Sequence, residues 1–230
     1  QTAVTNANSQ AGQRRSSGQG ANQTTTPQAQ TADGALTVAA AVQVDGNRHR
    51  LMDAATLIRL EDLTEAHRTA PFIAPAFVPA RRRGLVRMAA DAGFTARAAL
   101  VDPTSVVAST SRIGPGTYVN AMSVIASATR IGAHVFINRA CNIGHHVLIG
   151  DFASLGPGVT IPSSVRVGEG AVIGAGAVLL PGVVIGTGAI VSAGTRVHAD
   201  VPDGHLAIGA GPTIKPIRGD SRILIYPDQE

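Results

Sequence analysis

Large aliphatic side chains recur at every sixth position through the second half of the chain, without a break in register. Gly follows eight of them, and the side chain two positions before each is small or β-branched. Strand residues alternate between two faces, so the large side chain would fill an axis with the small one beside it. Three hexapeptides would close one triangular coil, and the pattern predicts six stacked coils of parallel strands over residues 101–208. The seventeen positions are Val101, Val107, Ile113, Val119, Ile125, Ile131, Ile137, Ile143, Ile149, Leu155, Ile161, Val167, Ile173, Leu179, Ile185, Val191 and Val197.

The region before the repeats has a different pattern. Residues 1–34 are rich in Gln, Thr, Asn, Ser and Ala and contain too little apolar surface to fold alone, so we expect a disordered tail. Residues 35–98 are predicted to form a small α/β domain. Its expected segments are a strand within 35–45, a helical or mixed segment at 53–67, an extended segment at 70–79 and an amphipathic helix at 80–93.

The remaining boundaries follow from where the repeat stops. The β-helix is assigned to residues 99–212, and residues 213–230 form a C-terminal extension whose segment Ser221–Tyr226 could add one strand. Three consecutive arginines, Arg81, Arg82 and Arg83, open the expected helix. We interpret them as a solvated helix face in preference to a phosphate site.

Composition narrows the range of partners. The net charge is +4 and almost all basic residues are Arg, but aromatic residues make up 3% and do not alternate with Arg, which disfavours nucleic acid. Phosphate-bearing small molecules are a better match for this charge. The single cysteine excludes an internal disulfide and favours a cytoplasmic location, and no apolar run has transmembrane length. Cys141 falls in the inward small-residue register, so we expect a buried core thiol.

One histidine falls outside the core register. His145 lies two positions after an axial residue, on a turn, so its imidazole would project outward. Imidazole titrates near neutral pH and is the usual general base of enzymes. Position alone leaves two interpretations, a general base or a solvated corner side chain.

The segment from Asn138 to Gly158, NRACNIGHHVLIGDFASLGPG, resembles the signature of the hexapeptide-repeat sugar O-acyltransferase family. That family includes sialic acid O-acetyltransferases and nucleotide-amino-sugar N-acetyltransferases, and the later pieces Asp200-Val-Pro202 and Gly211-Pro212 also resemble it. The resemblance implies a mainly β fold: a left-handed parallel β-helix of hexapeptide repeats, with residues 35–98 as a partial acceptor-binding α/β domain. It further implies a homotrimer with active sites between neighbouring subunits.

The same resemblance implies direct transfer of an acyl group from acetyl-CoA to a sugar or nucleotide-sugar hydroxyl or amine. His145 matches the family's catalytic base, and His146 stands where an acidic residue commonly tunes that base. Asn138 matches an acceptor-binding residue. Coenzyme contacts are implied for Ser154, Ser163, Gly174, Ala175, Ala193, Gly194 and Lys215, with the Ser163 backbone N–H facing the thioester oxygen.

Several alternatives stay open at this level. A zinc enzyme of the γ-carbonic-anhydrase type shares such a solenoid, but the histidines lack its ligand spacing, so no metal is expected. Residues 1–34 contain no strand with a glycine-rich turn of the kind that holds a nucleotide-sugar. A non-catalytic scaffold, or an acyltransferase for a small non-sugar metabolite, therefore remains possible. The choice between O- and N-transfer and the acyl chain length are also open.

Overall fold

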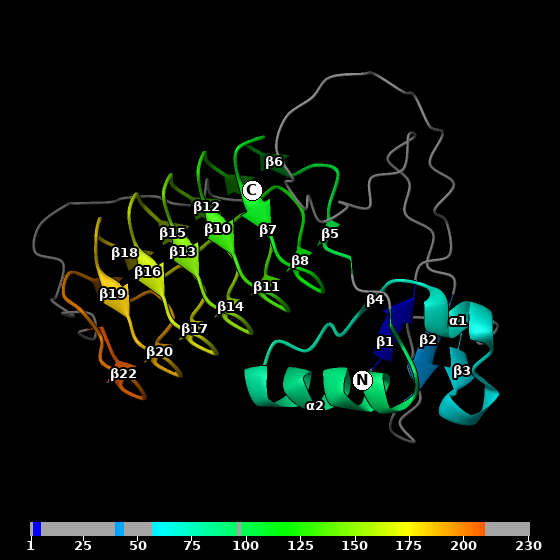
Figure 1. The fold of residues 1–230 in the computed structure, drawn as a ribbon. Coiled ribbons are helices and arrows are strands. Elements are labelled where there is room, and N and C mark those ends of the chain that lie inside the picture. Colours follow the sequence, from blue (N-terminus) through cyan, green and yellow to red (C-terminus); the bar gives the residue numbers. More distant parts are fainter. Residues whose placement is uncertain (1, 6–39, 44–56, 96–97, 210–230) are drawn as a thin grey trace, which may run out of the picture.

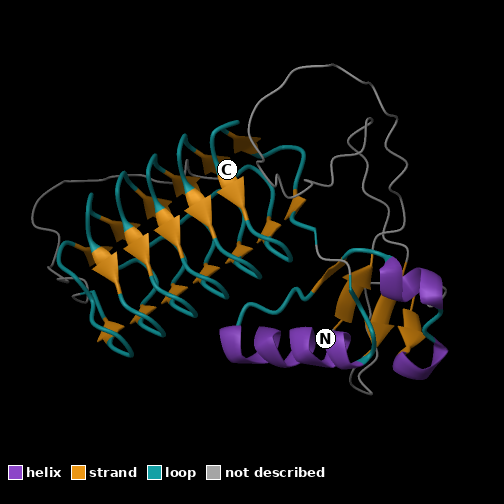
Figure 2. Cartoon of the chain, viewed as in Figure 1, coloured by secondary structure: helices purple, strands orange, loops and turns teal. Residues whose placement is uncertain are grey.

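The computed structural model describes residues 2–5, 40–43, 57–95 and 98–209, and its main body is a three-sided parallel β-helix (Figures 1 and 2). Each side is a parallel sheet of two-residue strands, paired between residues 18 positions apart in all but the last coil. This architecture confirms the predicted mainly β fold of hexapeptide coils and fits a left-handed β-helix.

We number the three sides of the β-helix as faces. The first face comprises β5 (Leu100–Val101), β8 (Tyr118–Val119), β11 (Phe136–Ile137), β14 (Ser154–Leu155), β17 (Val172–Ile173), β20 (Ile190–Val191) and β22 (Leu206–Ala207). The second comprises β6 (Val106–Val107), β9 (Val124–Ile125), β12 (Asn142–Ile143), β15 (Thr160–Ile161), β18 (Val178–Leu179) and β21 (Arg196–Val197). The third comprises β7 (Arg112–Ile113), β10 (Arg130–Ile131), β13 (Leu148–Ile149), β16 (Arg166–Val167) and β19 (Val184–Ile185).

The axis is filled as the six-residue period predicts, because every axial aliphatic residue except Val107 is buried. In the early coils the small inward positions carry hydroxyls, which are buried at Ser111, Thr117, Ser123 and Thr129. Each of these hydroxyls donates a hydrogen bond to the carbonyl 15 residues later in the chain. Buried hydroxyls are costly unless bonded, so these links explain how polar side chains are accommodated at the axis.

The last coil differs from the pattern. Val201 follows Val197 by four residues and not six, yet it is buried and bridges Ile185 in parallel. Asp203 supports this shortened turn, since its carboxylate oxygen accepts a hydrogen bond from the Thr187 backbone N–H at 2.7 Å. A strict six-residue search stops at Val197, whereas the fold continues to β22.

The N-terminal part forms a small α/β domain beside the early coils (Figure 1). Its sheet has the order β3-β2-β1-β4. The prediction of disorder over 1–34 is wrong for Thr2–Thr5, because this short run of β-branched residues and alanine pairs with two strands; the rest of 1–34 lies outside the described residues. The elements are β1 (Thr2–Thr5), β2 (Ala40–Gln43), β3 (Leu57–Arg59), the 3-10 turn η2 (Leu60–Asp62), α1 (Glu65–Thr69), β4 (Phe72–Ile73) and α2 (Pro79–Asp91).

Helix α2 is the predicted amphipathic helix, with a proline in its first turn, where the missing N–H costs nothing. Leu85, Val86 and Ala89 pack with Phe72 and Phe94 in the small domain's core. The interpretation of the arginine run as a solvated face is wrong for Arg82, which is 1% exposed. Its guanidinium finds enough backbone carbonyls to replace water, as described below. No helix among the described residues is long and apolar enough to span a bilayer.

Candidate functional site

The turns between faces form three columns of corners. The first corner joins the first and second faces and carries Asn138, the second joins the second and third faces and carries His145, and the third returns to the first face and carries Phe152. The predicted site residues are therefore sorted by corner, since residues 18 apart stack in one column.

His145 and His146 lie exposed on the second corner. Their Nδ1 atoms are 2.8 Å apart and their rings meet edge-to-face at 88°. A contact this short requires one nitrogen to donate a proton and the other to accept it. When His145 Nδ1 is the donor, its Nε2 carries the lone pair and is the basic atom.

The backbone beneath this pair is fixed from inside the β-helix. Buried Thr129 donates its hydroxyl to the Gly144 carbonyl at 2.8 Å and accepts the Val147 N–H at 3.2 Å. A Cβ on Gly144 would lie 2.8 Å from the backbone nitrogen of Ser163, so only glycine lets the next coil approach this closely. The His145 corner is thus held against the half-buried Ser163 of the following coil.

The first corner gathers Asn138 and four of the predicted coenzyme residues: Gly174, Ala175, Ala193 and Gly194. Asn138 is half-buried, and its side-chain oxygen accepts the Arg139 N–H at 2.8 Å, so it also serves as a local turn former. Ala175, Ala193 and Gly194 are exposed, and nothing lies within 4 Å of a Cβ built on Gly194. An extended ligand arm can therefore approach the backbone along this column.

The structure does not place two of the predicted coenzyme residues, Ser154 and Lys215, on the first corner. Ser154 is fully buried on the first face. Its hydroxyl accepts a hydrogen bond from Arg82 at 2.9 Å and donates one to the Phe77 carbonyl at 2.6 Å. The small domain covers this position in the single chain, and the coenzyme contact of Ser154 stays a prediction. Lys215 lies outside the described residues, as do Gly211-Pro212 and the extension 213–230.

Cys141 occupies the core position expected from its register and is 1% exposed. Its thiol donates to the Gly156 carbonyl at 3.2 Å, and burial raises the pKa of the thiol to about 11. The thiol is therefore protonated at neutral pH, when a nucleophilic cysteine would be a thiolate.

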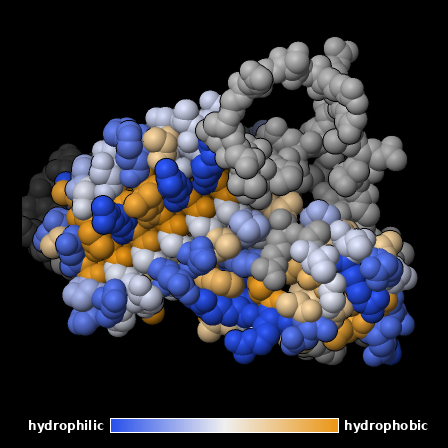
Figure 3. Space-filling view, in the orientation of Figure 1, coloured by the Kyte–Doolittle hydropathy of each residue, from blue (hydrophilic) through white to orange (hydrophobic). Residues whose placement is uncertain are grey.

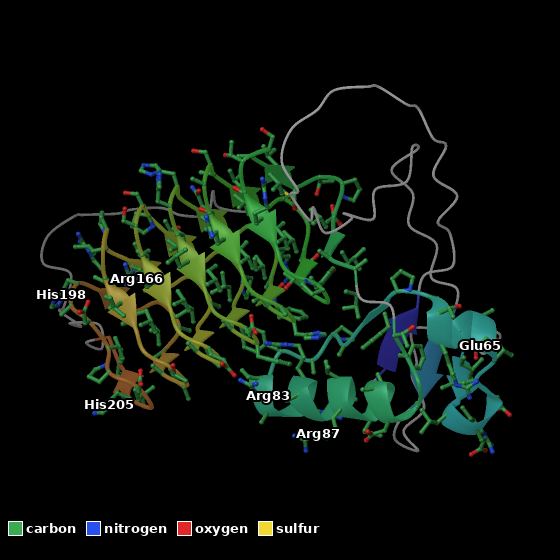
Figure 4. All side chains as sticks on the ribbon, in the orientation of Figure 1. Glu65, Arg83, Arg87, Arg166, His198 and His205 are labelled. Atoms are coloured by element: carbon green, nitrogen blue, oxygen red, sulfur yellow. The ribbon has the colours of Figure 1, made fainter. Side chains whose placement is uncertain are left out.

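Sequence reasoning missed a groove on the third face. It has a volume of about 450 Å³. Along it, apolar Leu148 lies between the basic side chains of Arg130 and Arg166, and Val184 follows Arg166. Figure 3 shows the apolar band along this face with hydrophilic patches on it, and Figure 4 shows Arg166 on the same side. A signal was present, because Arg112, Arg130 and Arg166 are separated by multiples of 18 residues and must share a face.

The family model "Bacterial transferase hexapeptide (six repeats)" matches residues 164–199. No curated protein sequence matches significantly. The perosamine N-acetyltransferase PerB from Caulobacter crescentus, solved with CoA and GDP-perosamine, is 37% identical with a TM-score of 0.57, covering 61% of this chain and 68% of that one.

Two further solved structures are similar. The acetyltransferase domain of PglB from Neisseria gonorrhoeae, in complex with acetyl coenzyme A, is 25% identical with a TM-score of 0.64, covering 74% of this chain and 84% of that one. WeeI from Acinetobacter baumannii is 26% identical with a TM-score of 0.55, covering 57% and 64%.

Proposed function

Because the chain belongs to the family of hexapeptide-repeat sugar acyltransferases, we propose that it transfers an acetyl group from acetyl-CoA to an amine or hydroxyl of a nucleotide-linked sugar. The similar structures support both the acetyl-CoA donor and the nucleotide-sugar acceptor. PerB was solved with CoA and GDP-perosamine, and the PglB domain with acetyl coenzyme A.

The observation that carries the proposal is the 2.8 Å contact between the two exposed imidazoles on the second corner. His146 accepts the Nδ1 proton of His145 and holds that ring in the tautomer whose Nε2 is basic. His146 stands where the family commonly has an acidic residue, so a neutral imidazole takes that orienting role and His146 is a positioning residue. A fixed general base of this kind contributes about 10²–10⁴-fold to rate.

The acyl transfer needs no covalent enzyme intermediate. The acceptor nitrogen or oxygen attacks the thioester carbonyl carbon while His145 Nε2 removes its proton. The carbon–sulfur bond breaks, the acyl group stays on the acceptor, and the departing sulfur takes the proton from His145 Nε2. The Ser163 backbone N–H lies on the same corner and is the candidate donor to the developing oxyanion.

The surfaces fit a long anionic donor. The bare first corner along Gly174, Ala175, Ala193 and Gly194 accommodates a thin arm against backbone. Arg130 and Arg166 sit two strands apart on the third face, a separation of about 10 Å, which suits the phosphates of a coenzyme or nucleotide. Acetyl-CoA supplies the activated thioester when bound.

A single chain does not bring the whole site together. The second face separates the Asn138 corner from the His145 corner, so one β-helix cannot place both beside the same acceptor atom. We therefore propose a homotrimer, in which the first corner of one subunit faces the second corner of its neighbour. The cytoplasmic location stays a prediction.

The test is release of CoA thiol from acetyl-CoA with a panel of amino-sugar nucleotides and sialic acids. We expect turnover with one acceptor class and a loss of about 10²-fold or more in His145→Ala. His198→Ala is the matched control, because His198 is an exposed histidine on the same corner column, three coils further on (Figure 4). It should retain wild-type activity.

The acceptor panel also separates the alternatives. Coenzyme binding without turnover on any acceptor would overturn the proposal in favour of a scaffold, and equal losses in both histidine variants would overturn the base assignment. Turnover on a small non-sugar amine alone would keep the chemistry and replace the acceptor class.

A further inference from the structure

Arg82 is the most extensively bonded side chain in the described part of the chain, and the proposed chemistry does not use it. Its Nε donates to the His134 carbonyl at 2.7 Å. Its Nη1 donates to the carbonyls of Ala76 and Phe77. Its Nη2 reaches the Phe152 carbonyl at 2.5 Å, the Ala153 carbonyl at 3.0 Å and the Ser154 hydroxyl. The side chain thus joins α2, the segment before it and two consecutive coils.

All six of these bonds go to neutral oxygens. A buried charge normally needs an opposite charge or a full set of hydrogen bonds. The Arg82 guanidinium is stabilised by hydrogen bonds alone. Burial lowers the pKa of Arg82 to about 10, with the neighbouring Arg83 as a smaller cause, so the side chain is still a cation at neutral pH. A planar fork of five N–H donors suits this cluster of carbonyls, which a lysine could not satisfy.

The coils change composition where Arg82 binds them. The last position of the third corner is Gly116, Gly170, Gly188 or Gly204 in other coils, each with positive φ, but His134 and Phe152 in the two coils that contact Arg82. Both keep the left-handed backbone, with φ of 54° and 57°. Non-glycine residues take the same backbone on the other two corners, at Met122, Ala128, Ala140, His146 and Ser164, so the turn itself sets φ. What is particular to these two coils is a ring on the third corner, where the other coils have glycine.

The two unusual rings build a stack along the edge of the β-helix. The His134 and Phe152 rings stack with centroids 5.1 Å apart, and the Arg83 guanidinium lies 4.1 Å from the Phe152 centroid. A Cβ on Gly116 would collide with the His134 ring at 2.2 Å, so the stack ends on glycine at that side. Arg83 also pairs with Glu169 at 2.7 Å in the coil above. Figure 4 shows Arg83 at the end of α2 that meets the coils.

Stacked coils of nearly identical backbone contain no inherent mark of axial position, since a shift by one coil recreates the same surface about 4.8 Å away. We propose that Arg82 is a positioning residue which, with the His134–Phe152 stack, fixes the small domain in a single axial register against the coil that carries His145. This inference rests on the proposed function, because the register determines where the small domain presents an acceptor relative to the base.

Three of the residues that Arg82 binds lie at the end of the coil that carries His145 and at the start of the next one. Phe152, Ala153 and Ser154 follow His145 directly through β13 and the third corner. The core of the small domain continues into the β-helix at this point, because Phe152 packs against the cluster around Phe72 and Phe94. A displacement of α2 by one coil would break all these contacts together.

The experiment compares Arg82→Met with Arg87→Met, a matched control on the exposed side of the same helix. In the whole 230-residue chain, hydrogen–deuterium exchange should accelerate by about tenfold or more in α2 and around Phe152 in Arg82→Met, with the coils beyond Thr160 unchanged. The acceptor KM should rise by about tenfold while the Kd for CoA stays unchanged. Arg87→Met should match the wild type in all three measurements.

A second variant, Phe152→Gly, tests the proposal even if Arg82→Met fails to fold. Phe152→Gly restores the glycine of the other coils, which relieves the backbone and removes the stack. It should leave the thermal unfolding of the β-helix unchanged or raise it, and still accelerate exchange in α2. Unchanged exchange in both variants, or acceptor KM and CoA Kd worsening together, would overturn the register proposal. Absence of turnover in the wild type would instead overturn the proposed function. Hydrogen–deuterium exchange in α2 would still show whether Arg82 fixes the small domain against the coils.

Discussion

The axis of the β-helix and the docking surface of the small domain are built in opposite ways, one from repeated contacts and the other from contacts that occur once. Along the axis, the same aliphatic position is repeated from coil to coil, and each side chain packs between aliphatic residues of the neighbouring coils. At the third corner, contact depends on residues that occur once: a buried arginine, a serine hydroxyl and two rings in place of glycine. Repetition builds a stable rod, whereas a single defined contact requires the repetition to be broken.

This difference places stability and specificity in separate regions. Axial residues are interchangeable among aliphatic types because each coil offers the same space. The Arg82 contacts have no equivalent elsewhere in the described chain, so their loss cannot be absorbed by a neighbouring coil. Substitutions on the axis should therefore change the free energy of unfolding, and substitutions at the docking surface should change the relation between the two parts.

The largest expected effect is from Ile143→Ala on the axis of the coil that carries His145. Ile143 is fully buried, so removing three carbons leaves a cavity that the stacked strands cannot close. We expect the free energy of unfolding to fall by about 3 kcal/mol, measured by urea denaturation of the full chain. Val106→Ala is the control, because Val106 is 65% exposed on the second face and should change stability by less than about 0.5 kcal/mol. Equal effects would mean that the axis is not the main core.

The sequence predicted the periodic region well for a physical reason. A six-residue period leaves one arrangement in which every large aliphatic residue is buried, so coil number, face assignment and the inward placement of Cys141 all follow. The shortened last coil was missed because Val201 breaks the spacing while keeping its place in the core. Strand β1 was missed because four residues in a polar segment carry almost no periodic signal.

The candidate site was only partly accessible from sequence. The corner positions of His145 and Asn138 follow from the repeat, and so does their separation by the second face. The burial of Ser154 and Arg82 does not, because it depends on a domain whose docking position has no period to reveal it. Arginine is usually exposed, and only the tertiary contact with six oxygens reverses that expectation.

A smaller effect tests how closely the coils must stack at the predicted coenzyme corner. A Cβ on Gly174 would lie 2.4 Å from the Ala193 backbone nitrogen, so Gly174→Ala must push two coils apart. We expect a loss of about 2 kcal/mol in the free energy of unfolding. At Gly194 the space is open but φ is +69°, so Gly194→Ala should cost about 1 kcal/mol from backbone strain alone.

The same pair of variants separates packing from ligand contact. CoA affinity lost in Gly174→Ala reports a distorted coil, whereas affinity lost in Gly194→Ala reports a ligand that lies against that corner. Calorimetric titration with CoA measures both. If neither variant changes CoA affinity, the first corner does not hold the coenzyme arm and the third-face groove becomes the better location.

The smallest expected effect is at the docking surface, in the ion pair between Arg83 and Glu169. The pair is short, 2.7 Å, but both side chains are partly exposed, and such pairs contribute about 0.5 kcal/mol and are screened by salt. Glu169→Gln should therefore weaken protection of α2 from hydrogen exchange slightly at low salt and not at high salt, since the Arg83–Phe152 ring contact remains. The contrast with Arg82→Met is the informative quantity. If Glu169→Gln released α2 as fully as Arg82→Met, the register would depend on surface charge and not on the buried arginine, and the separation between a repetitive rod and one defined docking contact would fail.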